Sequence, residues 1–299
     1  MTTDTRPSSA PPVSADQLAA LLAAMKESDS VELKLTVPTE EHRATIARLP
    51  IDPVEAQPRQ VFFFDTPDLA LDRAGIVVRA RRIQGGDGDT VVKLRPVVPA
   101  DLPGSLRKSP SFKVEVDVLP GGIGVCSGSL KGVTTGADIR QVVEGTRPVS
   151  KVFTKEQRAF FADHAPAGLD MDALVPLGPT FILKSVFKAK ELGRRVVTEL
   201  WLYQDGSRIL EVSTKCAPHE AFQVAAEARV YLHEHGVTVG GQQATKTRTA
   251  LEYFSRQFAA SAGTQPGGDD GARTTTRKAK AEPEASAPSE SPAETAPAS

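Results

Sequence analysis

The sequence has only two cysteines, Cys126 and Cys216, so it lacks the disulfide framework of a small secreted domain. It has no run of about 18 apolar residues, the length that a membrane-spanning helix needs. Its first residues, MTTDTRPSSAPP, contain no apolar stretch of the kind found in a signal peptide. These absences predict a cytoplasmic protein that does not associate with a membrane.

The chain also lacks a strong net charge. Its 36 basic and 37 acidic residues leave a formal charge of −1, so no global attraction to nucleic acid is expected and any basic site must be local. The 299 residues are 40% apolar, an ordinary composition for a globular protein with a sizeable core. Nothing in the sequence indicates the oligomeric state.

The two ends differ from the middle of the chain in composition. Residues 1–13 are mainly Ser, Thr, Pro and Ala, and residues 259–299 contain no Phe, Leu, Ile, Val, Tyr or Trp. Such segments bury too little apolar surface to offset the entropy lost on ordering. We therefore expect two disordered tails around one folded domain at residues 14–258.

Hydrophobic periodicity within that domain changes along the chain. Residues 14–26 carry a helical stripe of Leu and Met, with Ser14 placed to cap the helix. Alternating apolar and polar residues then predict antiparallel strands with one polar face, at 31–35, 76–81, 92–95, 112–118, 182–188, 199–202 and 210–215. Further helices are predicted at 150–164, 217–235 and 245–258. The stretches 97–111 and 120–148 are typical of long loops, and the second is rich in glycine.

The polar faces of these strands carry charges sorted by sign. Arg79 with Arg81 and Lys93 with Arg95 are basic pairs, whereas Glu115 with Asp117 is an acidic pair. Like charges at neighbouring strand positions repel, and they repel more strongly where water is scarce. A bound polyphosphate group would offset the basic pairs, and a divalent cation would let the carboxylates share its site.

One segment resembles a known family. The sequence FFFDTPDLALDRAGIVVRAR at residues 62–81 is very similar to a hairpin of the CYTH family, which groups class IV adenylate cyclases with thiamine triphosphatases and is also called the triphosphate tunnel metalloenzymes. Other family motifs are matched in the same order, so the resemblance spans residues 28–256; they are Glu32-Leu33-Lys34, Val92–Pro96, Glu115-Val116-Asp117, Ile209–Lys215 and Thr245–Arg248.

The resemblance implies an α+β fold in which about eight antiparallel strands close into a tunnel with helices outside. It implies a magnesium or manganese cofactor, held by Glu32, Glu115, Asp117 and Glu211. It implies a triphosphate-containing ligand, bound by Lys34, Arg79, Arg81, Lys93, Arg95, Lys184, Lys188, Lys215 and Lys246. Glu32, Lys34 and Glu115 would take part in the reaction.

The resemblance leaves three activities open. The protein would hydrolyse inorganic, nucleoside or thiamine triphosphate, or cyclise ATP to cyclic AMP, or bind a polyphosphate or nucleotide without turnover. Ser30 and Ser213 stand where the family pattern has Glu. The number of metal ions and the strength of any turnover therefore also stay open.

Overall fold

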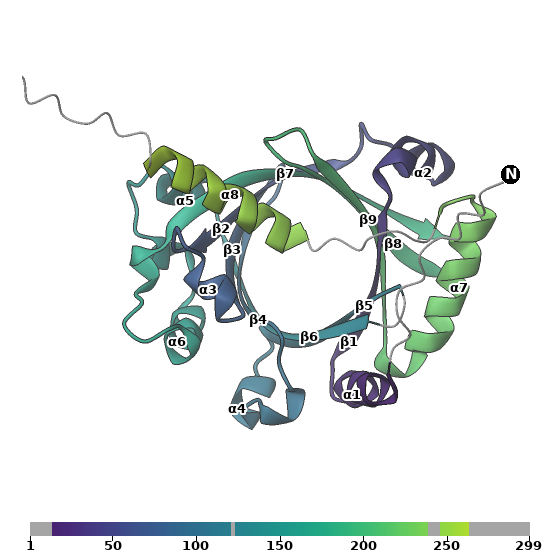
Figure 1. Ribbon diagram of the computed structural model, residues 1–299, viewed down its shortest axis with the longest axis horizontal. Helices are drawn as coiled ribbons and strands as arrows, with labels where there is room; N and C mark the ends of the chain where they lie inside the picture. The colour runs from purple at the N-terminus through teal and green to yellow at the C-terminus, as the bar shows by residue number, and fades with distance from the viewer. Residues whose placement is uncertain (1–13, 121–122, 239–245, 263–299) are drawn as a thin grey trace, which may run out of the picture. The chain divides into compact units, whose positions relative to one another are not determined.

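The computed structural model describes residues 14–120, 123–238 and 246–262, and nine strands in this part of the chain form one closed barrel (Figure 1). The strands are β1 (Ser30–Val37), β2 (Gln57–Asp65), β3 (Ile76–Ile83), β4 (Gly88–Leu94), β5 (Phe112–Leu119), β6 (Ile123–Thr134), β7 (Val175–Ala189), β8 (Arg194–Leu202) and β9 (Arg208–Cys216). Around the ring their order is β1-β5-β6-β4-β3-β2-β7-β8-β9, and β9 closes onto β1. The closed tunnel expected from the sequence resemblance is confirmed.

The barrel differs from that expectation in the number and direction of its strands. It has nine strands instead of about eight, and it is mixed instead of wholly antiparallel, because β1 and β5 run parallel. An odd number of strands cannot alternate in direction all the way round a closed ring. One parallel pair is therefore required, and it brings the acidic segments of β1 and β5 side by side.

Helices surround the ring (Figure 1). They are α1 (Ala15–Lys26), α2 (His42–Arg48), α3 (Ala70–Arg73), α4 (Gly104–Arg107), α5 (Gly136–Val143), α6 (Lys155–His164), α7 (Ala221–Glu234) and α8 (Lys246–Ala262). Ser14 caps α1 as predicted, since its hydroxyl accepts a hydrogen bond from the Gln17 amide at 3.2 Å. No described helix combines the length and the apolar content needed to cross a bilayer.

The predicted helices are confirmed within a few residues, whereas α2, α3, α4 and α5 were not predicted. Helix α8 continues to Ala262, past the domain boundary expected at residue 258. The predicted tail at 1–13, and the part of the predicted tail 259–299 that follows residue 262, lie outside the described residues.

The strands turn their apolar faces outward and most of their charged residues inward. Phe62, Phe64, Val78 and Val92 are buried in one cluster with residues of α1, α5 and α6, which lie outside the ring. A second cluster packs β1 and β9 against α7. A third packs α8 against β2, β7, β8 and β9 on the inner side of the ring, where Phe63 shares a strand face with Arg79. Burial of the outer surface under helices is what allows the inner surface to be polar.

The segment that resembles the family hairpin is antiparallel, with a short helix at its tip. β2 pairs with β3, and α3 lies between them. The buried Asp65 carboxylate accepts hydrogen bonds from the backbone amides of Thr66, Leu71 and Asp72, at 2.7, 2.8 and 3.0 Å. It thereby satisfies amide groups at the start of α3 that have no partner within the helix.

The two predicted long loops are wrong. Residues 97–111 contain a 3-10 turn, Pro99–Asp101, and α4. Residues 120–148 contain β6 and α5, so the glycine-rich run is a barrel strand. Its glycines at 124, 128 and 132 are needed for close packing, because a Cβ at each would overlap a neighbouring side chain.

We predict that Gly132→Ala destabilises the protein by about 1–3 kcal/mol, the usual cost of overpacking. The added Cβ would lie 2.6 Å from Gln157 Oε1 and 2.8 Å from Thr90 Oγ1, and both of these residues are buried. Urea denaturation measures the change in the free energy of unfolding. Gly104→Ala is the control, because a Cβ there meets nothing within 4 Å. Equal stability of the two variants would contradict the packing role.

Candidate functional site

The inward faces of the strands enclose a cavity of about 630 Å³. Strand alternation sends every second side chain into it, so the charged members of the predicted period-two segments meet there. Predicted site residues that line it are Glu32, Lys34, Arg79, Arg81, Lys93, Arg95, Asp117, Lys184, Glu211, Lys215 and Lys246. Eight predicted cations thus face one enclosed space, seven of them from six elements and Arg95 from the residue directly after β4.

The basic side of the cavity is formed by β3 and β4. Arg81 is held by Asp89, whose carboxylate accepts from Nε at 2.9 and 3.0 Å. Arg79 and Lys93 have no ion pair among the described residues, and Arg79 Nε is buried without a hydrogen-bond partner. Burial and then the nearby Arg81 lower the pKa of Arg79 to about 10. Burial lowers the pKa of Lys93 to about 8, although Asp117 acts in the opposite direction. Neither Arg79 nor Lys93 therefore has an ion-pair partner within the described residues.

Three carboxylates form a cluster beside these cations. The parallel pairing of β1 with β5 sets Glu32 opposite Asp117 and Ser30 opposite Glu115. Glu32, Glu115 and Asp117 each offer one oxygen, and these oxygens lie within 4.8 Å of one another. Ser30, at the position where the family pattern has Glu, donates a hydrogen bond to Glu115 Oε2 at 3.3 Å. The serine thus orients one carboxylate of the cluster instead of adding a fourth.

Three cations pair with the carboxylate cluster, namely Lys34, Lys215 and Arg95, whose Nη1 lies 3.3 Å from Asp117 Oδ2. Lys34 Nζ lies 2.9 Å from Asp117 Oδ1 and 3.3 Å from Glu32 Oε2. Lys215 pairs with Glu115, and its Nζ is 3.7 Å from Glu32 Oε2. Burial acts to lower the pKa of Lys34, but Glu32, Asp117 and Glu211 outweigh it and raise that pKa well above its ordinary value. Lys34 is therefore a permanent cation.

The carboxylate cluster fits a hard divalent cation. All three potential ligands are carboxylate oxygens, the donors that Mg²⁺ and Mn²⁺ prefer. Asp117 is 2% exposed, and neither of its oxygens accepts a hydrogen bond of normal geometry within the described residues, although both lie near cations. Lone pairs therefore remain for a metal ion at Glu32, Glu115 and Asp117.

A second ion-pair network lies where α8 meets the barrel. Lys246 Nζ donates to Glu211 Oε1 at 2.6 Å and to Glu199 Oε2 at 2.8 Å, and it lies 5.0 Å from the centre of the Trp201 ring. Trp201 Nε1 also donates to Glu199 Oε2, at 3.1 Å. Burial acts to raise the pKa of Glu199, but Lys246 outweighs it and lowers that pKa far below its ordinary value. The network anchors the first residue of α8 in the cavity wall.

The placements of the predicted residues differ in three cases. Glu211 is paired with Lys246 and is not part of the carboxylate cluster. Lys188 is exposed and does not line the cavity, because the end of β7 that carries it extends beyond the cavity. Glu115 is not among the lining residues either, although its carboxylate belongs to the cluster and pairs with Lys215.

Five charged lining residues were not predicted as site residues, namely Asp72, Asp89, Lys131, Glu199 and Arg248. Glu199 follows the period-two pattern of β8, and that pattern was the available signal. Lys131 was hidden in the glycine-rich run that was interpreted as a loop.

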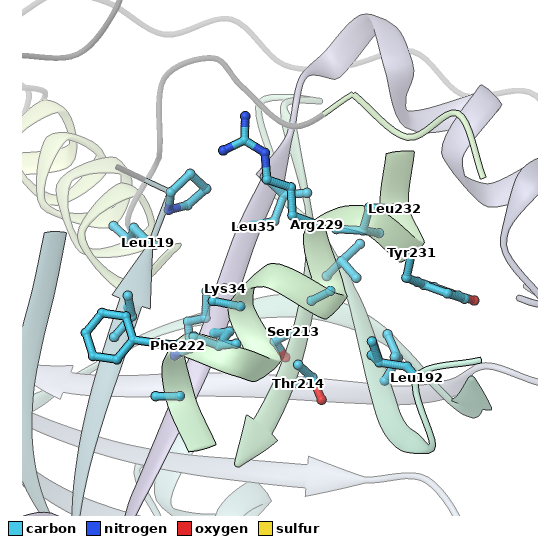
Figure 2. Close-up of a pocket in the computed structure, with 18 of the residues that line it drawn as sticks. Lys34, Leu35, Leu119, Leu192, Ser213, Thr214, Phe222, Arg229, Tyr231 and Leu232 are labelled. Atoms are coloured by element: carbon cyan, nitrogen blue, oxygen red, sulfur yellow. The ribbon is translucent and has the colours of Figure 1, made fainter. Parts of the chain in front are cut away.

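A second hollow of about 290 Å³ lies outside the ring, against α1 and α7. Figure 2 shows Phe222 and Leu119 on one side of it and Leu192, Tyr231 and Leu232 on the other. Its lining is mainly aliphatic and aromatic, and Lys34 and Arg229 are the only cations among its described lining residues, so it lacks the cluster of cations that a phosphate chain requires. The charged cavity inside the barrel is therefore the candidate site for an anionic ligand.

Comparison with known proteins identifies the fold. The sequence matches no family model and no curated protein. Two solved structures are similar. HpAC1 from Hippeastrum, named as a candidate adenylyl cyclase with a dominant triphosphatase activity, aligns with a TM-score of 0.56 at 16% identity, covering 74% of this chain and 95% of that one. A candidate adenylate cyclase from Bacillus halodurans aligns with a TM-score of 0.51 at 12% identity, covering 74% and 97%. The protein has a CYTH-like fold, as the sequence resemblance predicts.

We predict that the affinity for inorganic triphosphate falls as the pH rises through the pKa of Lys93, about 8. Lys93 is charged below that value and neutral above it, so the cavity loses one positive charge. Calorimetric titrations from one pH unit below to one above measure the change. Lys93→Met should remove this component and leave only the titration of the ligand itself. Identical pH profiles for the two proteins would contradict the role of Lys93.

We also predict that Glu115→Ala weakens Mn²⁺ binding by about ten-fold or more, since loss even of groups that support a metal ligand has an effect of that size. Calorimetric titration with Mn²⁺ measures the affinity. The control is Glu40→Ala, an exposed glutamate outside the cavity. Unchanged Mn²⁺ affinity in a folded Glu115→Ala protein would remove this residue from the metal site.

Proposed function

We propose that the protein binds the triphosphate group of its substrate inside the barrel and hydrolyses it with the aid of Mg²⁺ or Mn²⁺. The observation that carries this proposal is the pair of half-buried cations, Arg79 and Lys93, that have no ion pair among the described residues yet lie in one cavity with the carboxylate cluster. Buried charges without partners are costly, and a phosphate chain supplies the missing anion.

Each group of side chains has a distinct task in this proposal. Arg79 and Arg95 hold phosphate oxygens through their planar donor groups, and Lys93 adds a point charge. Glu32, Glu115 and Asp117 would hold the metal ion, which supplies further neutralisation of phosphate charge when bound. Lys34 lies between Glu32 and Asp117 and keeps their charges compensated.

The reaction requires little covalent chemistry from the protein. A water oxygen forms a bond to the terminal phosphorus while the bond from that phosphorus to the bridging oxygen breaks. Orthophosphate and a diphosphate group leave. The cations of β3 and β4 stabilise the charge on the phosphoryl and departing oxygens, and positioning of this kind accounts for most catalysis of phosphoryl transfer.

Cyclisation of ATP is the second candidate. In that reaction the 3′-hydroxyl of ATP attacks the α-phosphorus and pyrophosphate leaves, and the same cations would serve it. The names of the two similar structures support both candidates. The dominant triphosphatase activity named for the Hippeastrum protein supports hydrolysis as the first choice.

The products distinguish these activities. The purified protein is incubated with inorganic triphosphate, ATP or thiamine triphosphate and with Mg²⁺ or Mn²⁺. We expect release of orthophosphate that stops when the metal is chelated. Formation of cyclic AMP and pyrophosphate would identify the protein as a cyclase instead of a hydrolase. Tight binding without product would identify it as a non-catalytic binder.

We further predict that Arg79→Ala weakens the binding of inorganic triphosphate by about 1.5–3 kcal/mol, the range for hydrogen bonds to charged groups. Arg79 is a sharper test than Arg81, which is already paired with Asp89. Calorimetry measures the affinity, and Arg43→Ala on the exposed surface of α2 is the matched control. The phosphate site is misplaced if Arg79→Ala and Arg43→Ala bind triphosphate equally well.

A further inference from the structure

The cationic surface does not end at the proposed triphosphate site. A second cavity, of about 390 Å³, adjoins the first at Lys184, which lines both. Its other basic residues are Arg59 of β2 and Arg195 of β8. Lys184 was expected to bind phosphate. Arg59 and Arg195 were not among the predicted site residues.

The strand register places Arg59 in line with the arginines of β3. Arg79 pairs with Phe63 and Arg81 pairs with Val61, while Arg59 lies two residues further along β2, opposite Ile83. Two residues of a strand advance it by about 7 Å and return the side chain to the same face. Arg79, Arg81 and Arg59 therefore form one inward row that leads from the first cavity into the second.

In the described part of the chain, cations outnumber carboxylates by three to two in the lining of the second cavity, and the cations are unpaired. Arg59, Lys184 and Arg195 have no ion pair within the described residues, and the Arg59 guanidinium donates only to the neutral Gln57 Oε1, at 2.6 and 3.1 Å. Asp52 and Glu55 also line the cavity, but Asp52 accepts from the backbone amide of Val54 in its own loop. Burial and then Arg81 lower the pKa of Arg59, while burial and then Arg59 lower the pKa of Lys184. Glu199 acts in the opposite direction on both groups, but it does not outweigh burial and the like charges.

The chemistry of the lining favours phosphate over an organic group. The residues described for the second cavity include no aromatic side chain on which a base or a thiazole ring would stack. An inorganic polyphosphate carries a negative charge on every unit and has no bulky end. It therefore matches a row of cations that continues through two adjoining cavities.

We infer that the second cavity is an anion subsite continuous with the triphosphate site, and that the ligand of this protein is a linear inorganic polyphosphate longer than three units. Its additional phosphates lie against Arg59, Lys184 and Arg195. This inference rests on the proposed function, because it extends the same bound chain.

The test compares ligand lengths in variants of the second cavity. Inorganic triphosphate and long-chain polyphosphate are titrated into the full-length protein, Arg59→Ala, Arg195→Ala and the control Arg43→Ala. We expect Arg59→Ala and Arg195→Ala each to lower the affinity for long-chain polyphosphate by about ten-fold, with the affinity for triphosphate within about two-fold of the parent protein. Arg195 is exposed, so Arg195→Ala keeps the test valid if Arg59→Ala fails to fold.

Three outcomes would overturn the inference: equal losses of affinity for both ligands, no loss for either, or a loss of ATP affinity alone, which would assign the cavity to the nucleoside.

The Arg79→Ala variant separates failure of this inference from failure of the proposed function. If Arg79→Ala weakens triphosphate binding and the Arg59 and Arg195 variants do not affect long-chain binding, only the second subsite is wrong. If Arg79→Ala leaves triphosphate binding unchanged, the proposed function itself fails.

Discussion

Closure of the sheet places every second residue of nine strands in one enclosed space, and the other features of the molecule follow from that constraint. Because the outer face of the ring is apolar and covered by helices, the charged residues have no other surface to occupy. The charges repel or pair across the cavity at a distance from bulk water, where each interaction is stronger than on an open sheet. The interior therefore acts as a single electrostatic unit.

The unit is divided into compensated and uncompensated parts. The carboxylates of β1 and β5 pair with Lys34, Lys215 and Arg95, and those of β8 and β9 share Lys246. The cations of β2, β3, β4 and β7 include several without an ion pair in the described part of the chain. An anionic ligand would pair with the cations that have no ion-pair partner. A divalent cation would take the place of the lysines beside the carboxylates. This division relates the fold to the proposed chemistry.

Glycines show where composition misleads. The run containing Gly124, Gly128 and Gly132 resembled a loop because glycine usually interrupts regular structure. In the barrel these residues lie at four-residue spacing on one face of β6, where α1, β5 and α6 approach too closely for a Cβ. Their role depends on neighbours that are distant in the chain. No local pattern reports such contacts, so both β6 and Lys131 were missed.

The sequence alone determined which residues alternate, which charges share a strand face and where most helices lie, because these properties depend on near neighbours along the chain. It also carried the motif that resembles the family hairpin, and with it the closed tunnel. Only the tertiary structure decided that β1 runs parallel to β5, that Glu211 belongs to Lys246 instead of the carboxylate cluster, and that Lys188 stays outside the cavity. The physical reason is that strand order, register and ring closure are set by packing between distant segments, and these decide which charges meet.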